Sequence, residues 1–77
     1  MNNDRRKIIR KIIATLNKVK SDIETVGEEE RDYFDNMPEN FQDSERGDKA
    51  DEAATELEDL ASEFDDITDR LLGIIEG

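Results

Sequence analysis

Seven acidic residues at helical spacing are the side chains of this sequence best placed to do chemistry. They are Asp22, Glu29, Glu52, Glu56, Asp59, Glu63 and Asp66. Carboxylates in such rows can act as general acids or bases, hold metal ions, or attract a basic partner. The residue types around them decide among these three roles.

The lack of histidine and cysteine narrows the catalytic and metal chemistry. Imidazole and thiolate ligands are missing, and so are a cysteine nucleophile and a histidine base. Glu pairs that hold two metals in helical bundles come with a Glu-x-x-His motif, which is absent here. Residues 43–48 depart from the D-x-[DN]-x-[DN]-G order of a calcium loop. We therefore predict no enzyme, no metal site and no cofactor.

The charge is unevenly distributed along the chain. Residues 1–20 hold seven bases and one acid, a formal charge of +6, whereas the 77-residue chain as a whole carries −11. Because nucleic-acid affinity comes from neutralising phosphates, we expect no direct binding to DNA or RNA. No apolar run is long enough for a membrane span or a secretory signal. We expect a cytoplasmic protein with no membrane partner.

Apolar residues recur at alternating steps of three and four, which is the spacing of a helix face. The first run is Ile9, Ile12, Leu16, Val19, Ile23, Val26 and Tyr33; the second is Ala50, Ala53, Leu57, Leu60, Phe64, Ile67, Leu71 and Ile74. Pro38 separates the two runs, and Asp43 or Ser44 is placed to cap the second. The pattern predicts a single all-α domain, residues 1–77, with helices over about 4–35 and 44–75 and a loop over 36–43. Gly27 is the one position where the first helix is expected to kink or break.

A heptad assignment that calls Ile9 an a position and Ile12 a d position pairs the two runs as an antiparallel, coiled-coil-like hairpin. Paired residue numbers then sum to 83, and the midpoint of that sum falls inside the predicted loop. The layers are Ile9 with Ile74, Ile12 with Leu71, Leu16 with Ile67, Val19 with Phe64, Ile23 with Leu60, Val26 with Leu57, Glu30 with Ala53 and Tyr33 with Ala50.

Most of the e positions beside this face are small or apolar and predict a surface for a second copy. They include Ile13, Gly27, Phe34, Gly47, Ala54, Ala61 and Ile75. A hairpin of two helices buries only a strip, so a further partner is expected to stabilise it. A homodimer that forms a four-helix bundle is the predicted assembly, and the alternative is that these residues fill the flank of a monomer.

The acidic residues occupy the opposite flank, where Asp22 is expected to face Glu63 and Glu29 to face Glu56. Opposed carboxylates repel each other, so their placement costs stability unless it serves another purpose. One interpretation is a solvated face that keeps the protein soluble. The other is a negative ridge that binds a basic partner.

The stretch 33–50 contains Tyr33, the run Asn36-Met37-Pro38-Glu39-Asn40 and a Ser44-x-x-Gly47 helix start. It resembles small acidic helical proteins of bacteriophages and prophages, which commonly carry a Tyr-Asp-Asn-Met-Pro-Glu-like turn. Phe34 departs from that pattern, and Gly47 is expected to make room for it. The resemblance implies a viral origin and a bacterial host, but no particular activity.

Two functions follow as hypotheses. In the first, a phage-derived protein-binding module inhibits or modulates a host or defence protein, with its acids in place of the phosphates that this target normally binds. In the second, the hairpin dimer is a structural or assembly adaptor and its charge serves only solubility. Binding that weakens strongly with salt favours the first, whereas a salt-insensitive interface favours the second.

Overall fold

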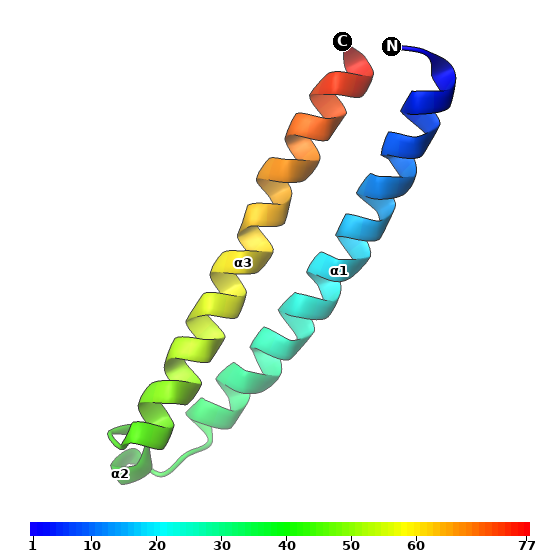
Figure 1. Cartoon of the computed structure of the whole chain (residues 1–77). Coiled ribbons are helices and arrows are strands. Elements are labelled where there is room, and N and C mark those ends of the chain that lie inside the picture. The colour runs from blue at the N-terminus through cyan, green and yellow to red at the C-terminus, as the bar shows by residue number, and fades with distance from the viewer.

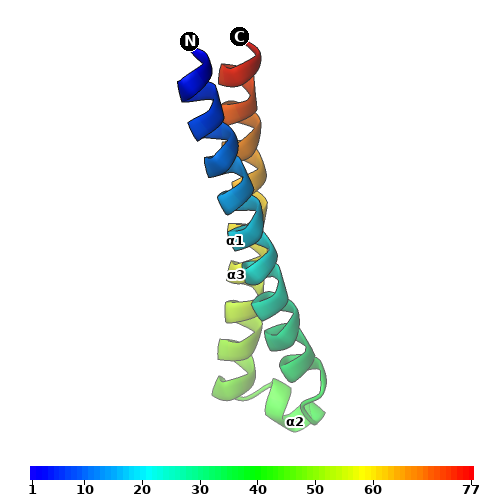
Figure 2. The same cartoon turned by 90° about the vertical axis from the view of Figure 1, so that its right-hand side faces the viewer.

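The protein is an antiparallel pair of long helices joined by a compact corner (Figure 1). The computed structural model describes all residues 1–77. Helix α1 spans Asn3–Asp35, α2 is a single turn at Glu39–Gln42, and α3 spans Glu45–Glu76. The two chain ends lie together at the end opposite α2 (Figures 1 and 2). The predicted all-helical fold with two paired helices is confirmed, and the short helix inside the predicted loop is new.

Polar side chains cap both long helices. Asn2 accepts a hydrogen bond from the backbone N–H of Arg5 at 2.8 Å, and Ser44 accepts one from Gly47 at 3.3 Å. Each cap satisfies one of the N–H groups that a helix start leaves without a partner. Of the two predicted caps for the second helix, Ser44 is the one used.

Gly27 does not break α1, which continues through it without interruption. Its role is a close approach between helices, because a Cβ built there would lie 3.3 Å from the Cβ of Leu57. Gly27 is also buried. The predicted kink is therefore wrong, and the missing side chain lets α3 come near.

The residues that face the partner helix are those at the a and e positions, not a and d. In α1 they are Arg6, Ile9, Ile13, Leu16, Lys20, Ile23, Gly27, Glu30 and Phe34. In α3 they are Gly47, Ala50, Ala54, Leu57, Ala61, Phe64, Thr68, Leu71 and Ile75. The predicted layers with Ile12, Val19, Val26 and Tyr33 inside are wrong, because all four side chains are exposed.

The difference is a rotation of each helix about its own axis by roughly 50°, the angle between the two faces at 3.6 residues per turn. The positions along the axis agree much better with prediction. Gly27 lies opposite Leu57, a sum of 84, and Arg6 donates a hydrogen bond to the Ile75 carbonyl, a sum of 81. The axial alignment with a sum of 83 is therefore confirmed to within two residues.

The buried part of the hairpin consists of small residues. Ala50, Ala54 and Ala61 are at most 4% exposed, and no large side chain is fully buried. Alanine and glycine let the helix backbones approach, and close approach maximises dispersion contacts along the pair. The larger a residues, such as Leu57 and Phe64, are half-buried beside them.

At the corner, Gly47 accommodates the backbone of α2. A Cβ there would overlap the carbonyl oxygen of Gln42 and lie 2.5 Å from that of Phe41. The Gln42 side chain in turn donates a hydrogen bond to the Phe34 carbonyl at 3.1 Å. The expectation that Gly47 makes room for the Phe34 side chain is wrong, since the nearest atoms belong to α2.

Adjacent alanines in α3 test the rotation of the helices. We expect Ala54→Leu to lower the free energy of unfolding by about 1–3 kcal/mol, because no space is left at a buried position. Ala53→Leu, at the exposed neighbour, should not lower it, because an exposed position leaves room for a larger side chain. Urea denaturation measures both values. A larger loss of unfolding free energy at Ala53 than at Ala54 would instead support the a/d packing that the sequence predicted.

Two glycines in the same helix form a second matched pair. Gly47→Ala should destabilise the protein by about 1–3 kcal/mol, because the new methyl group overlaps the α2 backbone. Gly73→Ala should stabilise it by about 0.5–1 kcal/mol, because its Cβ meets nothing within 4 Å and alanine favours helix. Thermal melting measures both changes, and melting temperatures that shift in the same direction for the two variants would contradict this account.

Candidate binding surfaces

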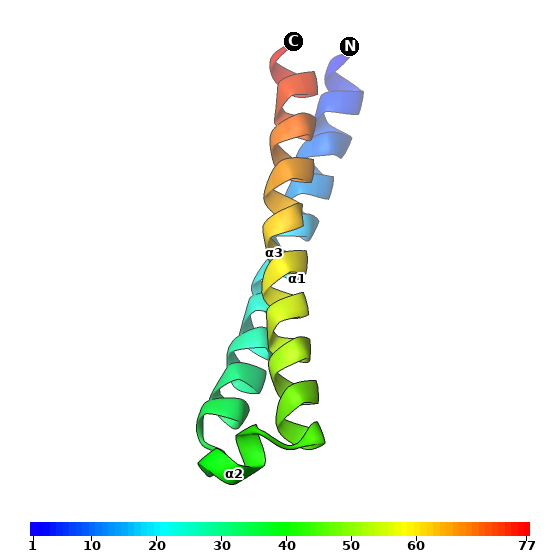
Figure 3. The ribbon, with the colours of Figure 1, turned by 90° about the vertical axis from the view of Figure 1, so that its left-hand side faces the viewer.

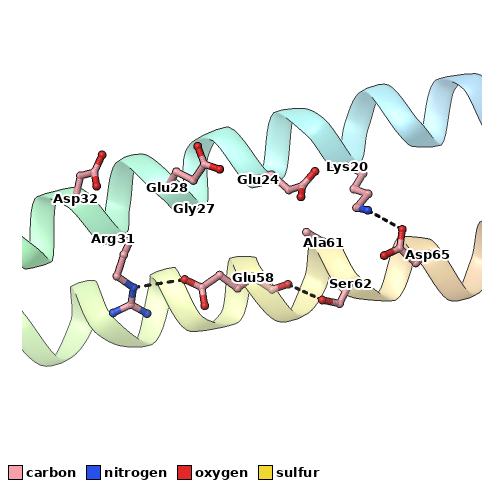
Figure 4. Close-up of a pocket in the computed structure, with 10 residues that line it drawn as sticks. All are labelled: Lys20, Glu24, Gly27, Glu28, Arg31, Asp32, Glu58, Ala61, Ser62 and Asp65. Carbon is pink, nitrogen blue, oxygen red and sulfur yellow. Dashed lines mark hydrogen bonds and ion pairs between the residues drawn. The ribbon is translucent and has the colours of Figure 1, made fainter.

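One flank of the hairpin carries the three ion pairs that join the two long helices. Lys20 binds Asp65 at 2.6 Å, while Arg31 binds Asp51 at 2.7 Å and Glu58 at 3.4 Å. Arg31 also donates a hydrogen bond to Thr55 and lies 5.8 Å from the ring centre of Phe34. Figure 4 shows Arg31 reaching across to α3, while Glu28 and Asp32 point away from it.

These contacts shift two pKa values upward. The hydrogen bond with Asp65 raises the pKa of Lys20, and the hydrogen bond with Asp51 raises that of Arg31. A raised pKa stabilises the folded state at every pH below the unfolded value, and this stabilisation is lost only as pH rises through the folded value. Both groups are therefore fully charged at neutral pH, and their solvent exposure keeps the contribution small.

Between the ion pairs lies a trough of about 310 Å³ beside Gly27 and Ala61 (Figure 4). Its acidic side chains, Glu24, Glu28, Asp32, Glu58 and Asp65, are all exposed. No buried side-chain nitrogen or oxygen lacks a hydrogen-bond partner. The trough is thus a depression between two helices that existing ion pairs already bridge.

The seven predicted acidic residues are all exposed and lie on the outer surface of the helices. From the observed packing, the c and g positions that they occupy point about 140–180° away from the neighbouring helix. The expected oppositions of Asp22 with Glu63 and of Glu29 with Glu56 are therefore wrong. Of the seven, only Asp22 has an ion pair, with Lys18 at 3.2 Å.

Five of these residues form a continuous row on α3, which we call the acidic ridge. The ridge consists of Glu52, Glu56, Asp59, Glu63 and Asp66. It extends over residues 52–66, a rise of about 21 Å at 1.5 Å per residue, with a carboxylate at every turn. None of the five makes an ion pair, so the ridge is an uncompensated row of negative charge.

The residues predicted to contact a second copy are used inside one chain. Gly27, Ala54 and Ala61 are buried between α1 and α3, and Gly47 is buried against α2, while Ile13, Phe34 and Ile75 are half-buried. A second copy would therefore have to contact other residues.

The structure exposes instead a row of d positions on each long helix, which we call the apolar flank. It consists of Ile12, Val19, Val26 and Tyr33 on α1, and of Ala53, Leu60, Ile67 and Ile74 on α3. Its large side chains remain 38–51% exposed. Sequence reasoning missed this surface because it took the largest apolar residues for the inner face. The signal that would have found it is the placement of glycine and alanine at e, where helices approach most closely.

Two kinds of feature, a cluster of metal ligands and a membrane-spanning helix, are not found in the structure. No group of three or more acidic side chains lies close enough together to hold a metal ion. Neither long helix contains a segment sufficiently long and apolar to cross a bilayer.

Comparison with known proteins found no match. No protein-family model, curated protein or solved structure is similar to this chain.

Reversing one cross-helix ion pair tests the polar flank, by which we mean the side of the hairpin that carries the ion pairs of Lys20 and Arg31. Lys20→Glu should lower the melting temperature, because it places a third negative charge beside Asp65 and Glu24. Adding Asp65→Lys to this variant should restore most of the loss. Circular dichroism melts measure both, with Lys11→Glu as a control at an exposed position of the same helix that makes no ion pair. A double variant no more stable than Lys20→Glu alone would show that the two side chains do not interact.

Proposed function

We propose that this chain is an acidic protein-binding module that acts as a homodimer and engages a basic surface of its partner. The acidic ridge carries this proposal. Its five carboxylates face solvent without an ion pair, although a lysine or arginine among them would have stabilised α3. Such a row raises the association rate and specificity for a positively charged partner.

The spacing of the ridge supports a nucleic-acid-like role. Its charges repeat about every 5.4 Å, of the same order as the ~3.4 Å axial spacing of phosphates on one DNA strand. The hairpin is 58 Å long and 15 Å wide, so the row lies on a rod. A protein that normally binds phosphates would meet a comparable line of charge here.

The resemblance of the 33–50 stretch to phage and prophage proteins supports a host or defence protein as the target. In this proposal the module works in the bacterial cytoplasm and inhibits or modulates its target by occupying a nucleic-acid site. The proposed mechanism is competitive binding and needs no catalytic residue, cofactor or metal ion.

The apolar flank favours a second candidate function. An exposed apolar row along both helices is typical of a surface that assembles with other helices. As a structural adaptor, the chain would use this row for assembly and its charge only for solubility.

A competition experiment separates the two functions. Tagged protein is incubated with bacterial lysate, and the retained proteins are identified by mass spectrometry before and after a duplex DNA wash. We expect the captured proteins to be nucleic-acid binders that are released both by DNA and by 0.5 M salt, since salt screens exposed charge. Capture that resists both DNA and salt would support the adaptor.

Charge-neutralising variants locate the binding surface. Glu56→Gln, Asp59→Gln and Glu63→Gln together should preserve or raise thermal stability and reduce capture at least tenfold. A matched control removes three acids from the corner instead, with Asp35→Gln, Glu39→Gln and Asp43→Gln, and should keep most of the capture. Equal capture by the ridge variant and the wild type would reduce the ridge to a solvated face.

A further inference from the structure

We infer that two hairpins stack through the apolar flank with opposite orientation, so that the open end of one copy lies beside the corner of the other. This inference rests on the dimeric part of the proposed function and is independent of what the acidic ridge binds. It differs from the surface that the sequence predicted, whose residues are already used inside the hairpin.

The first argument is burial. No large side chain in the hairpin is fully buried, whereas Val26, Tyr33 and Ile74 are about half exposed. A 58 by 15 Å face offers on the order of 800 Å² per copy, the size of a standard stable protein interface. Covering this face would give the a and d residues of both copies a common four-helix core.

The second argument is register. A two-fold axis through the middle of the α1 row brings Ile12 opposite Tyr33 of the other copy and Val19 opposite Val26. The same operation about the middle of the α3 row pairs Ala53 with Ile74 and Leu60 with Ile67. The two midpoints, 22.5 and 63.5, sum to 86, which is within two residues of the sum of 84 for Gly27 and Leu57, the facing pair nearest to them. One axis therefore serves both helices.

The third argument is charge. Within α1, residues 3–20 carry seven bases and one acid, and residues 21–35 carry one base and seven acids. The two halves have formal charges of +6 and −6, so α1 is neutral overall but strongly polarised. Opposite orientation places each half of α1 against the oppositely charged half of α1 in the other copy. Equal orientation would place α1 on α3 instead, where the negative half of α1 would meet residues 45–60, which carry seven acids and two bases.

The direction of this polarity excludes helix stability as its purpose. A helix favours acids near its N-terminus and bases near its C-terminus, because its own dipole is positive at the N-terminus. Helix α1 has the reverse order. Such an arrangement costs stability in an isolated helix and becomes favourable beside an inverted copy of itself.

The dimer also concentrates the acidic ridge. In this arrangement α3 lies on α3 of the other copy, and the outer faces of both carry the ridge residues. Helix α3 has 12 acids and three bases, so this edge of the bundle is strongly negative. The stacked pair of α1 helices forms the opposite, charge-balanced edge.

Sedimentation equilibrium tests the association. We expect the wild type to sediment at about twice the 8.9 kDa chain mass at tens of micromolar, with melting that depends on concentration. Val26→Glu with Leu60→Glu should give a monomer, because both residues lie in the apolar flank. Ala14→Glu with Thr25→Glu adds the same charge at exposed positions outside the apolar flank and should leave the mass doubled. A wild-type monomer, or a dimer unaffected by the first variant, would overturn the inference.

Disulfide trapping tests the orientation, and the chain has no native cysteine to interfere. A mixture of Val19→Cys and Val26→Cys chains should crosslink to a heterodimer in high yield under mild oxidation. A mixture of Val19→Cys and Ile67→Cys chains should not, because this pair meets only when the two copies have the same orientation. The reverse result would contradict opposite orientation.

The outcomes separate this inference from the proposed binding function. A monomer whose capture of nucleic-acid binders still depends on the ridge would remove the dimer and retain the binding module. A dimer whose capture of these proteins is unchanged by ridge neutralisation would retain the dimer and remove the binding module.

Discussion

The close approach of α1 and α3 along a line of glycine and alanine is the interaction on which the structure depends. Gly27 against Leu57, with Ala54 and Ala61 buried on α3, brings the helix axes together and fixes their rotation. Once these small residues face inward, helical geometry determines the rest. The ion pairs of Lys20 and Arg31 fall on one flank and the large aliphatic side chains on the other, while the acids point outward. Figure 3, which views the hairpin from the side, shows that the two helices cross over each other at a shallow angle along their length.

This packing divides the surface of the hairpin into regions with different uses. The polar flank closes the hairpin, since its charges are already paired across the helices. The apolar flank is left without a neighbour, and the acidic ridge is left without a counter-charge. A thin hairpin with no buried large side chain is poorly stabilised by its own core. A second copy on the apolar flank would stabilise it and would leave the acidic ridge exposed to solvent. The reversed charge polarity of α1 is consistent with such a dimer, because this polarity becomes favourable beside an inverted copy of the helix.

The helices, their ends and their axial alignment were predictable from the sequence, but the face on which they meet was not. Period and caps are local properties, so Ser44 and the seven-residue repeat indicate them directly. The rotation of a helix depends on which of two neighbouring rows packs more closely. Ile12 and Leu60 outweigh Gly27 and Ala61 in hydrophobicity, yet the smaller residues allow the closer approach. The acidic positions were found correctly as exposed, whereas their opposition across the hairpin followed from the wrong face and failed with it. The short helix α2 also escaped prediction, because a single turn after Pro38 has no periodicity to detect.

Double electron–electron resonance on one spin label at the tip tests the account most directly. Asn40 is exposed in α2 and belongs to neither the apolar flank nor the acidic ridge, so a label there replaces none of their residues. Opposite orientation of two copies places the two tips at opposite ends of the bundle, and the spin–spin distance should approach the 58 Å length of the hairpin. A short distance between the labels, or the absence of any interaction between spins at concentrations of tens of micromolar, would contradict the account.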